Sequence, residues 1–208
     1  VVAAVRAGVR RIVRCSVLGA DTPDELVEGA WHNAGDEAVR RSGIAYTILR
    51  PNQYFQNFSN GRAAQTVRDQ GALYLPLENC AVSNIDTRDI AAIAAEVALA
   101  PGDEHHGREY DLTGGSAQTM AEVAAALGEA LGKPVQYVAV PEAPVRESLL
   151  GAGLPPAVAD AILGWFAYCR AGKAARVTDD ARRLLGREPI GVQQFARDHV
   201  GSYQGAAT

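Results

Sequence analysis

The chain has 208 residues, with 20 Lys and Arg against 24 Asp and Glu and a formal net charge of -4. This acidic balance, without a dense basic cluster, argues against nucleic-acid binding as its main task. No stretch approaches the roughly 20 consecutive apolar residues of a membrane helix, and no signal-peptide pattern is visible at the start. We therefore expect a cytoplasmic protein, with no nucleic-acid or membrane partner, that buries one main core and a smaller lobe.

The first 29 residues contain a strand between two helical signals. Residues 1–11 read as the end of a helix with a glycine turn, and residues 10–18 have the short β-branched core of a buried strand. The segment Thr22-Pro23-Asp24-Glu25 has capping-box spacing with proline at the first helical position, but Gly29 argues against a long helix there.

Helical and strand-like segments alternate from there to residue 140, which predicts an α/β layered fold. In chain order we expect a helix over 31–42, a buried strand over 44–51, a helix over 54–71 and an extended piece over 72–77. Over 81–102 we expect a strand that passes into a helix capped by Asp86 or Thr87. A strand over 108–115, a helix from the capping box at Thr119 to Leu131, and a strand over 134–140 follow. Beyond Pro141 the pieces 141–153, 155–172, 178–186 and 191–200 are helical in character.

Several polar residues have a simple structural interpretation. Cys15, Cys80 and Cys169 form no CxxC pair, so we interpret them as small buried apolar side chains. His105 and His106 lack further ligands at a recognisable spacing, so we assign them to solvent and expect no metal site.

Five segments resemble the NmrA-like branch of the atypical short-chain dehydrogenase/reductase superfamily. They are AGVRRIVRCSVLGA (7–20), SGIAYTILRPNQYFQNF (42–58), NIDTRDIAAIAA (84–95), GREYDLTGGSAQTMAEVAAALGEALGKPVQYVAVP (107–141) and VTDDARRLLGREPIGVQQFARDH (177–199). The resemblance implies the C-terminal part of a Rossmann-like parallel sheet flanked by helices. Residues 1–140 would form a partial NAD(P)-binding domain with interleaved substrate-lobe segments, and residues 141–208 a small helical substrate lobe.

In proteins of this kind the Gly-rich cofactor fingerprint precedes the segment that residues 1–16 resemble, so the resemblance implies that the sequence begins at the helix before the fifth strand. A search for G-x-G-x-x-G or G-x-x-G-x-x-G after a strand finds no match. Three explanations stay open: an incomplete sequence, a complementary N-terminal segment on another polypeptide, or loss of dinucleotide binding. A sheet lacking its central strands would expose an apolar edge, so a homodimer is a further candidate assembly.

The resemblance also implies site residues. Cys15, Ser16, His32 and the turn Pro51-Asn52-Gln53 would contact NADP or NAD, with NADP preferred. His32, Ser16 and Tyr54 would be catalytic, and the substrate side would be lined by Tyr54, Phe55, Asn57 and Trp165. Structural alternatives are a strand-end hydrogen bond for Ser16, a solvated helix position for His32 and core packing for the aromatic residues. For Asp86, Arg88 and Asp89 we favour structural roles.

The usual Tyr-x-x-x-Lys pair is absent, because no tyrosine lies four residues before Lys133 or Lys173. Reduction of a simple carbonyl needs an acid for the developing alkoxide, whereas a quinone or cationic dye gives a delocalised or neutral product. For the NAD(P)H-dependent hydride transfer that the resemblance implies, the missing pair therefore favours a quinone or similar conjugated acceptor, a small-molecule substrate. The alternatives are an NAD(P)-sensing regulator without turnover and a cofactor-free protein on a degenerate Rossmann fold.

Overall fold

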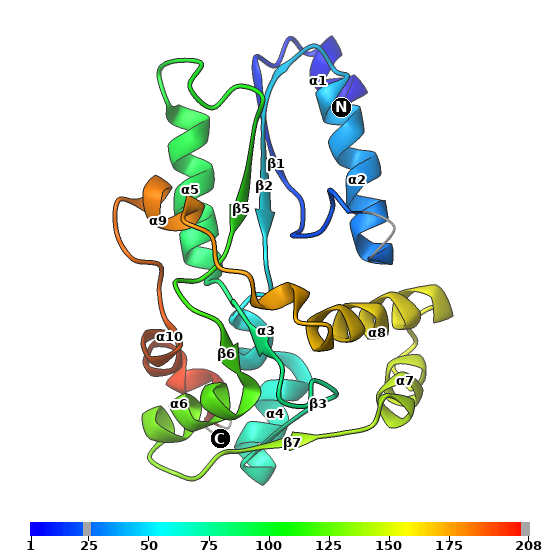
Figure 1. The fold of residues 1–208 in the computed structure, drawn as a ribbon, viewed down its shortest axis with the longest axis vertical. Coiled ribbons are helices and arrows are strands. Elements are labelled where there is room, and N and C mark those ends of the chain that lie inside the picture. The colour runs from blue at the N-terminus through cyan, green and yellow to red at the C-terminus, as the bar shows by residue number, and fades with distance from the viewer. Residues whose placement is uncertain (23–25, 205–208) are drawn as a thin grey trace.

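A three-stranded parallel sheet forms one lobe of the molecule, which a computed structural model describes over residues 1–22 and 26–204 (Figure 1). Its strands are β1 (Arg11–Cys15), β2 (Ala45–Pro51) and β5 (Arg108–Leu112), in the order β1-β2-β5. Helix α2 (Val27–Arg40) covers one face and α5 (Thr87–Leu99) the other, while α1 (Val2–Arg6) precedes β1 (Figure 1). Because all three strands are parallel, their carboxyl ends meet at one edge, which faces the second lobe.

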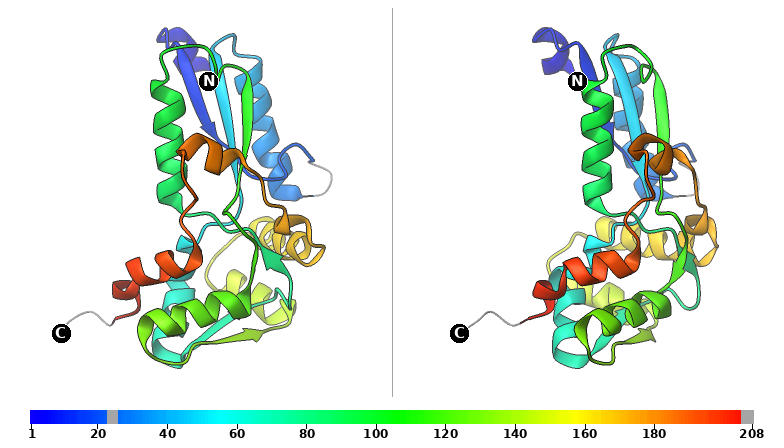
Figure 2. Two further views of the ribbon diagram at one scale, coloured as in Figure 1. Left: turned by 60° about the vertical axis from the view of Figure 1, so that its left-hand side comes forward. Right: turned by 90° about the vertical axis from the view of Figure 1, so that its left-hand side faces the viewer.

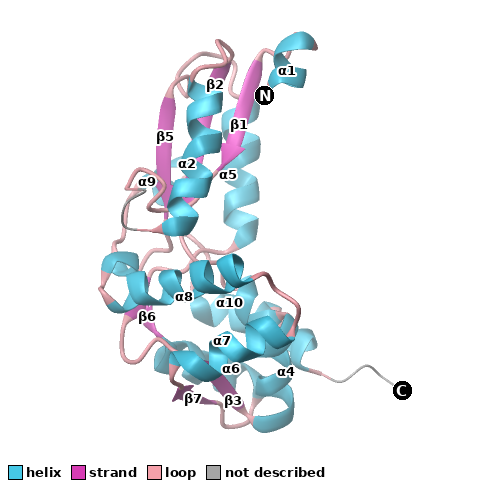
Figure 3. Cartoon of the chain, turned by 90° about the vertical axis from the view of Figure 1, so that its right-hand side faces the viewer, coloured by secondary structure: helices cyan, strands magenta, loops and turns pink. Residues whose placement is uncertain are grey.

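The second lobe is mainly helical and carries two small sheets (Figures 2 and 3). Its elements are α3 (Gln56–Ser59), α4 (Gly61–Gln70), β3 (Ala72–Leu75), β4 (Ala81–Val82), β6 (Gln118–Thr119), α6 (Met120–Leu131), β7 (Gln136–Ala139), α7 (Glu142–Gly151), α8 (Pro156–Arg170), the 3-10 helix η1 (Lys173–Ala175), α10 (Val192–Asp198) and the 3-10 helix η2 (Val200–Tyr203). Strands β3 and β7 pair in parallel, and β4 and β6 pair antiparallel.

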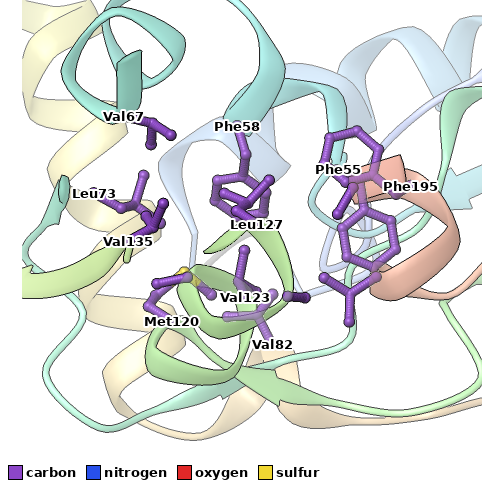
Figure 4. Packing of buried hydrophobic residues seen from close by; sticks show 14 of the residues in the cluster. Phe55, Phe58, Val67, Leu73, Val82, Met120, Val123, Leu127, Val135 and Phe195 are labelled. Carbon is purple, nitrogen blue, oxygen red and sulfur yellow. The ribbon is translucent and has the colours of Figure 1, made fainter. Parts of the chain in front are cut away.

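Each lobe has its own hydrophobic core. Under α5, the side chains of Leu49, Tyr110 and Leu112 pack against Ile90 and Ile93. The larger core belongs to the second lobe, and its labelled members in Figure 4 are Phe55, Phe58, Val67, Leu73, Val82, Met120, Val123, Leu127, Val135 and Phe195. The chain crosses between the lobes repeatedly, and α9 (Asp180–Leu185) returns to the sheet to pack against α5 and β5.

Most predicted elements are present, within a few residues of their expected bounds. The capping box of α6 is complete: the Glu122 amide donates to the Thr119 hydroxyl, and the Thr119 amide donates to the Glu122 carboxylate. Gly132 ends that helix in the left-handed conformation, at φ 63°. Of the two candidate caps for α5, the structure uses Asp86, which accepts the Arg88 amide hydrogen at 2.9 Å.

The helix expected over 31–42 begins earlier, because α2 includes Gly29. A Cβ atom at this glycine would lie 2.6 Å from the Gly19 carbonyl oxygen. The glycine therefore permits close packing of the helix on the loop after β1 instead of interrupting it. The cap expected at Thr22 to Glu25 lies outside the described residues, except for Thr22.

The helix expected over 54–71 is broken into α3 and α4. Asn60 has extended backbone angles, φ -137° and ψ 172°, and Gly61 follows at φ 55°. The Asn-Gly pair supplies both conformations at little cost, and it redirects the chain between the two helices.

Three expectations about single residues are wrong. Cys15 is exposed, because it is the last residue of β1, which lies at the edge of the three-stranded sheet, and Cys80 is half-buried; only Cys169 of the three cysteines is buried. His105 is also not a solvent residue, since its Nδ1 lies 2.9 Å from the Tyr110 hydroxyl and its side chain is only 12% exposed. His106 Nδ1 accepts the Tyr46 amide hydrogen, so the loop before β5 folds back onto the sheet.

Among residues 1–22 and 26–204, no helix is both long enough and apolar enough to cross a membrane. The same residues contain no cluster of three or more His, Cys, Asp or Glu side chains arranged to hold a metal ion.

Candidate functional site

A cavity of about 340 Å³ opens where the carboxyl ends of β1 and β2 meet the helical lobe. This edge of a parallel sheet is where open α/β folds place their ligands. The cavity is lined by Val17, Leu26, Glu28, Pro51, Asn52, Gln53, Tyr54, Asn57, Phe58, Ala63, Leu75, Ile162, Trp165 and Phe166. Most of these side chains are apolar or aromatic, so the cavity suits a flat apolar ligand.

The turn after β2 forms one wall and is held rigidly. The buried Asn52 side chain donates to the Ser83 hydroxyl and to the Ala174 carbonyl, both at 2.8 Å, and accepts the Gln53 amide hydrogen at 2.9 Å. The Gln53 carbonyl in turn accepts the Ile85 amide hydrogen at 2.9 Å. Asn52 therefore fixes the turn to the helical lobe, and its side-chain polar atoms are already engaged within the protein.

Tyr54 follows this turn and presents its ring to the cavity. Burial, together with the neighbouring Cys15 thiol and Glu28 carboxylate, raises the pKa of the Tyr54 hydroxyl well above its usual range. Tyr54 therefore stays protonated at neutral pH and is a hydrogen-bond donor rather than a strong acid. No lysine is near enough in sequence to form the usual Tyr-x-x-x-Lys pair with it.

Ser16 lies at the end of β1 in a buried polar network. Its hydroxyl donates to Asp36 Oδ2 at 2.6 Å, and Arg14 Nε donates to the other oxygen of that carboxylate at 3.2 Å. Ser16 and Asp36 are both almost completely buried. A hydroxyl can donate only one hydrogen bond, and Ser16 donates it to the buried carboxylate. Ser16 can therefore only accept a hydrogen bond from any further partner.

His32 lies one helical turn before Asp36 on α2. It lines a second cavity of about 230 Å³ with Arg14, Glu28, Trp31, Val158, Ala161 and Ile162. Glu28 and Ile162 also line the first cavity, so the two are adjacent. The His32 Nδ1 atom is buried and has no hydrogen-bond partner among the described residues, which is uncommon and marks a place where a ligand or water completes the bonding.

The profile of the NmrA-like family matches residues 1–193 of this chain. The NAD(P)H azoreductase of Xenophilus azovorans is 37% identical over 208 residues, which are 100% of this chain and 71% of that relative. The chain belongs to the NmrA-like family. Quinone oxidoreductase 2 of Escherichia coli is 34% identical over 158 residues, covering 76% of this chain and 54% of that protein.

Solved structures of NmrA-like proteins have the same fold. The NADPH-dependent quinone oxidoreductase of Escherichia coli, complexed with NADPH, superposes with a TM-score of 0.80 at 29% identity. The match covers 94% of this chain and 68% of the oxidoreductase chain. The triphenylmethane reductase of a Citrobacter species, complexed with NADP(H), gives a TM-score of 0.77 at 25% identity over 95% and 67% of the two chains. The expected Rossmann-like α/β fold is thereby confirmed.

The residues predicted for an NmrA-like site divide into three groups by position. Pro51, Asn52, Gln53, Tyr54, Asn57 and Trp165 line the first cavity, and His32 lines the second. Cys15 and Ser16 lie at the end of β1, Cys15 against Tyr54 and Ser16 against Asp36. Phe55 points away from the first cavity into the core, where its ring stacks on Phe195 with centroids 5.2 Å apart.

Sequence reasoning missed Glu28 and Asp36. Gly29 argues locally against a helix at Glu28, whereas α2 includes both residues and Glu28 lines both cavities. Asp36 carried a usable signal, because a residue four positions after His32 lies on the same face of a helix.

Asp86 and Asp89 brace the fold, as expected. Asp86 caps α5 and also accepts from Gln56 and from the Arg88 guanidinium. Asp89 accepts the Ile190 amide hydrogen at 2.6 Å and bonds Arg187 at 2.7 Å, which ties α5 to the segment before α10. Neither residue lines the two cavities at the sheet edge.

Proposed function

We propose that this chain carries the acceptor-binding and nicotinamide-facing part of an NAD(P)H-dependent reductase that transfers hydride to a quinone or similar conjugated acceptor. The observation that carries the proposal is the largely apolar cavity at the carboxyl edge of the sheet, beside a histidine with an unpartnered buried ring nitrogen. The azoreductase and quinone oxidoreductase relatives support the reaction class.

The residues at this edge fit the nicotinamide end of NADP or NAD. The His32 Nδ1 atom has no hydrogen-bond partner among the described residues and is available to a ligand. The Ser16 hydroxyl donates its hydrogen bond to Asp36, so its oxygen can accept one from a ligand. The turn Pro51 to Gln53 supplies a rigid wall. A bound reduced nicotinamide would supply a hydride, and we propose NADPH as the preferred donor. Such a donor is available in the cytoplasm, which is the location we propose.

The acceptor side follows from the chemistry of the lining residues. Trp165, Phe166 and Tyr54 offer aromatic surface for a flat conjugated ring. Tyr54, with its raised pKa, can donate a hydrogen bond to an acceptor oxygen but is a poor source of a full proton. A quinone or dye fits this arrangement, because its reduced product is delocalised or neutral and tolerates delayed protonation from His32 or solvent.

The test begins with the intact mass and N-terminal sequence of the purified protein, which define the polypeptide assayed. Titration with NADPH and NADH follows, and then steady-state assays with a panel of quinones and azo or triarylmethane dyes. Nucleotide binding with turnover of at least one acceptor is the expected result. Binding without turnover of any acceptor would indicate a nucleotide-sensing protein, and binding of neither nucleotide would overturn the proposal.

A further inference from the structure

Glu28 is the only charged residue among those that line the first cavity in the described part of the chain. It lies in the first turn of α2, at the positive end of the helix dipole. No other described residue forms a hydrogen bond or an ion pair with this carboxylate, whereas Asp36 on the same helix and Glu109 on β5 are both paired with arginines.

Among residues 1–22 and 26–204, no cationic side chain pairs with Glu28. Arg14 lines the adjacent cavity with it, but Arg14 Nε is engaged with Asp36 at 3.2 Å. The negative charge also reaches Tyr54, since Glu28 is one of the groups that raise the pKa of that hydroxyl, after burial and Cys15. The charge of the carboxylate therefore acts on Tyr54, one of the residues that a flat ligand would contact.

We propose that Glu28 makes the cavity selective for aromatic electron acceptors that carry a positive charge and disfavours acceptors that carry sulfonate or carboxylate groups. A cationic acceptor would place its aromatic rings against Trp165 and Phe166 and its charge towards the Glu28 carboxylate. An anionic acceptor of the same shape would meet a like charge in a partly desolvated site, where charge interactions are stronger than in water. This inference rests on the reductase function proposed above, because it names the acceptor class of the same cavity.

Binding is measured first, in the absence of nucleotide. Three 1,4-naphthoquinones of the same skeleton, with a trimethylammonium, a methyl or a sulfonate substituent at one position, are titrated against the full protein. Replacement of the exposed Trp31 by phenylalanine leaves Trp165, in the cavity wall, as the single tryptophan that reports binding through its fluorescence. We expect the cationic quinone to bind about tenfold more tightly than the anionic one, and the preference to shrink as salt is added.

Glu28→Gln removes the charge and keeps the shape of the side chain. It should reduce the ratio of cationic to anionic affinity to within about twofold, and Glu28→Lys should reverse the order. Glu96→Gln on α5 is the matched control: it removes one exposed carboxylate away from the cavity and should keep the wild-type ratio. Circular dichroism verifies that each variant is folded.

The proposal is overturned if the three quinones bind equally, if none of them binds, or if Glu28→Gln keeps the wild-type preference. Turnover with NADPH separates this result from the proposed function. Charge-dependent binding that Glu28→Gln abolishes, with no turnover of any acceptor, would leave the selectivity of the cavity standing while the reductase function fails. The same charge preference in kcat/KM would support both.

Discussion

At the scale of single residues, the site depends on which polar atoms are already engaged. Asn52 and Ser16 use their hydrogen-bonding atoms within the protein, Asn52 to fix a turn and Ser16 to bond Asp36. His32 Nδ1 and the Glu28 carboxylate have no such partner among the described residues. The unengaged groups are therefore the ones available to a ligand, and the engaged groups hold the geometry.

Replacement of His32 by alanine should lower turnover and leave the fold intact. His32 is on the surface of a cavity and its Nδ1 bonds no other described residue, so its replacement breaks no hydrogen bond at that atom. We expect kcat with a quinone to fall by about a hundredfold, the lower end of what a positioned proton-transfer group contributes. Steady-state kinetics and thermal melting of the same preparation check both parts, and unchanged kinetics would remove His32 from the mechanism.

Asp36→Asn should weaken the fold more than a surface substitution does. The change leaves the Ser16 hydroxyl and the Arg14 guanidinium facing a neutral amide in a buried position. We expect a loss of about 2 kcal/mol in the free energy of unfolding. Urea titration measures it, with the exposed Asp103→Asn as control; equal stability of the two variants would contradict the role given to Asp36.

At the scale of elements, close backbone packing and ion pairs attach α2 to the sheet. Gly29 allows the helix to approach the loop after β1, and Arg40 near its other end bonds both oxygens of Glu109 on β5, at 2.7 and 2.9 Å. Arg50 on β2 contacts the same carboxylate. Helix α2 is thus attached at both ends, which places Glu28 and His32 relative to the sheet edge.

Gly29→Ala should destabilise the protein, although alanine favours helices over glycine by about 1 kcal/mol. The new Cβ would lie 2.6 Å from the Gly19 carbonyl oxygen, so helix and loop must separate. We expect a net loss of about 1–2 kcal/mol. Gly164→Ala in α8 is the matched control, because a Cβ there meets no atom within 4 Å, and it should be neutral or stabilising in the same urea titration.

Glu109 should contribute a pH-dependent part of the stability. The hydrogen bonds from Arg40, with the charge of Arg50, lower the pKa of its carboxyl against the opposing effect of burial. A carboxyl with a lowered pKa in the folded state stabilises the protein above its unfolded value of about 4.3, and that stability disappears as pH falls through the folded value.

Glu109→Gln should therefore cost about 1–2 kcal/mol at pH 7 and progressively less below about pH 4. Urea titrations of both proteins at pH 7, 5, 4 and 3 measure the difference, with the exposed Glu129→Gln as control. A difference that stays constant across this range would show that the ion pair contributes nothing through its charge.

At the scale of the whole molecule, successive segments of the chain contribute alternately to the two lobes. The core of the helical lobe takes Phe55 and Phe58 from the segment after β2, Val123 and Leu127 from α6, and Phe195 from α10. The sheet lobe in turn takes Ala181 from α9. Because each core draws on separated segments, neither lobe can be complete without the rest of the chain.

A truncated chain of residues 1–140 should fail to fold cooperatively. It lacks Phe166, Cys169 and Phe195, which are buried in the core of the helical lobe, and the α9 residues that cover the sheet. We expect a broad, non-cooperative thermal transition by circular dichroism, compared with a single sharp transition for the full 208 residues. A sharp transition in the fragment would show that residues 1–140 are an independent domain.

The sequence by itself determined the elements and the family. Local signals such as the capping box at Thr119, the glycine at position 132 and the proline that ends β2 act within a few residues, so they predict element bounds from sequence alone. The motifs at residues 42–58 and 84–95 identify the NmrA-like family because they occur along the chain in the same order as in that family.

Only the tertiary structure decided which side chains meet at the site. In the sequence, Gly29 argues against a helix. In the structure it lies within one, because only a glycine can approach the Gly19 carbonyl oxygen of a different segment so closely. Phe55 packs in the core while Tyr54 lines the cavity, and Cys15 is exposed rather than buried. Burial, unpaired charge and hydrogen-bond partners depend on segments far apart in the chain, and no local pattern records them.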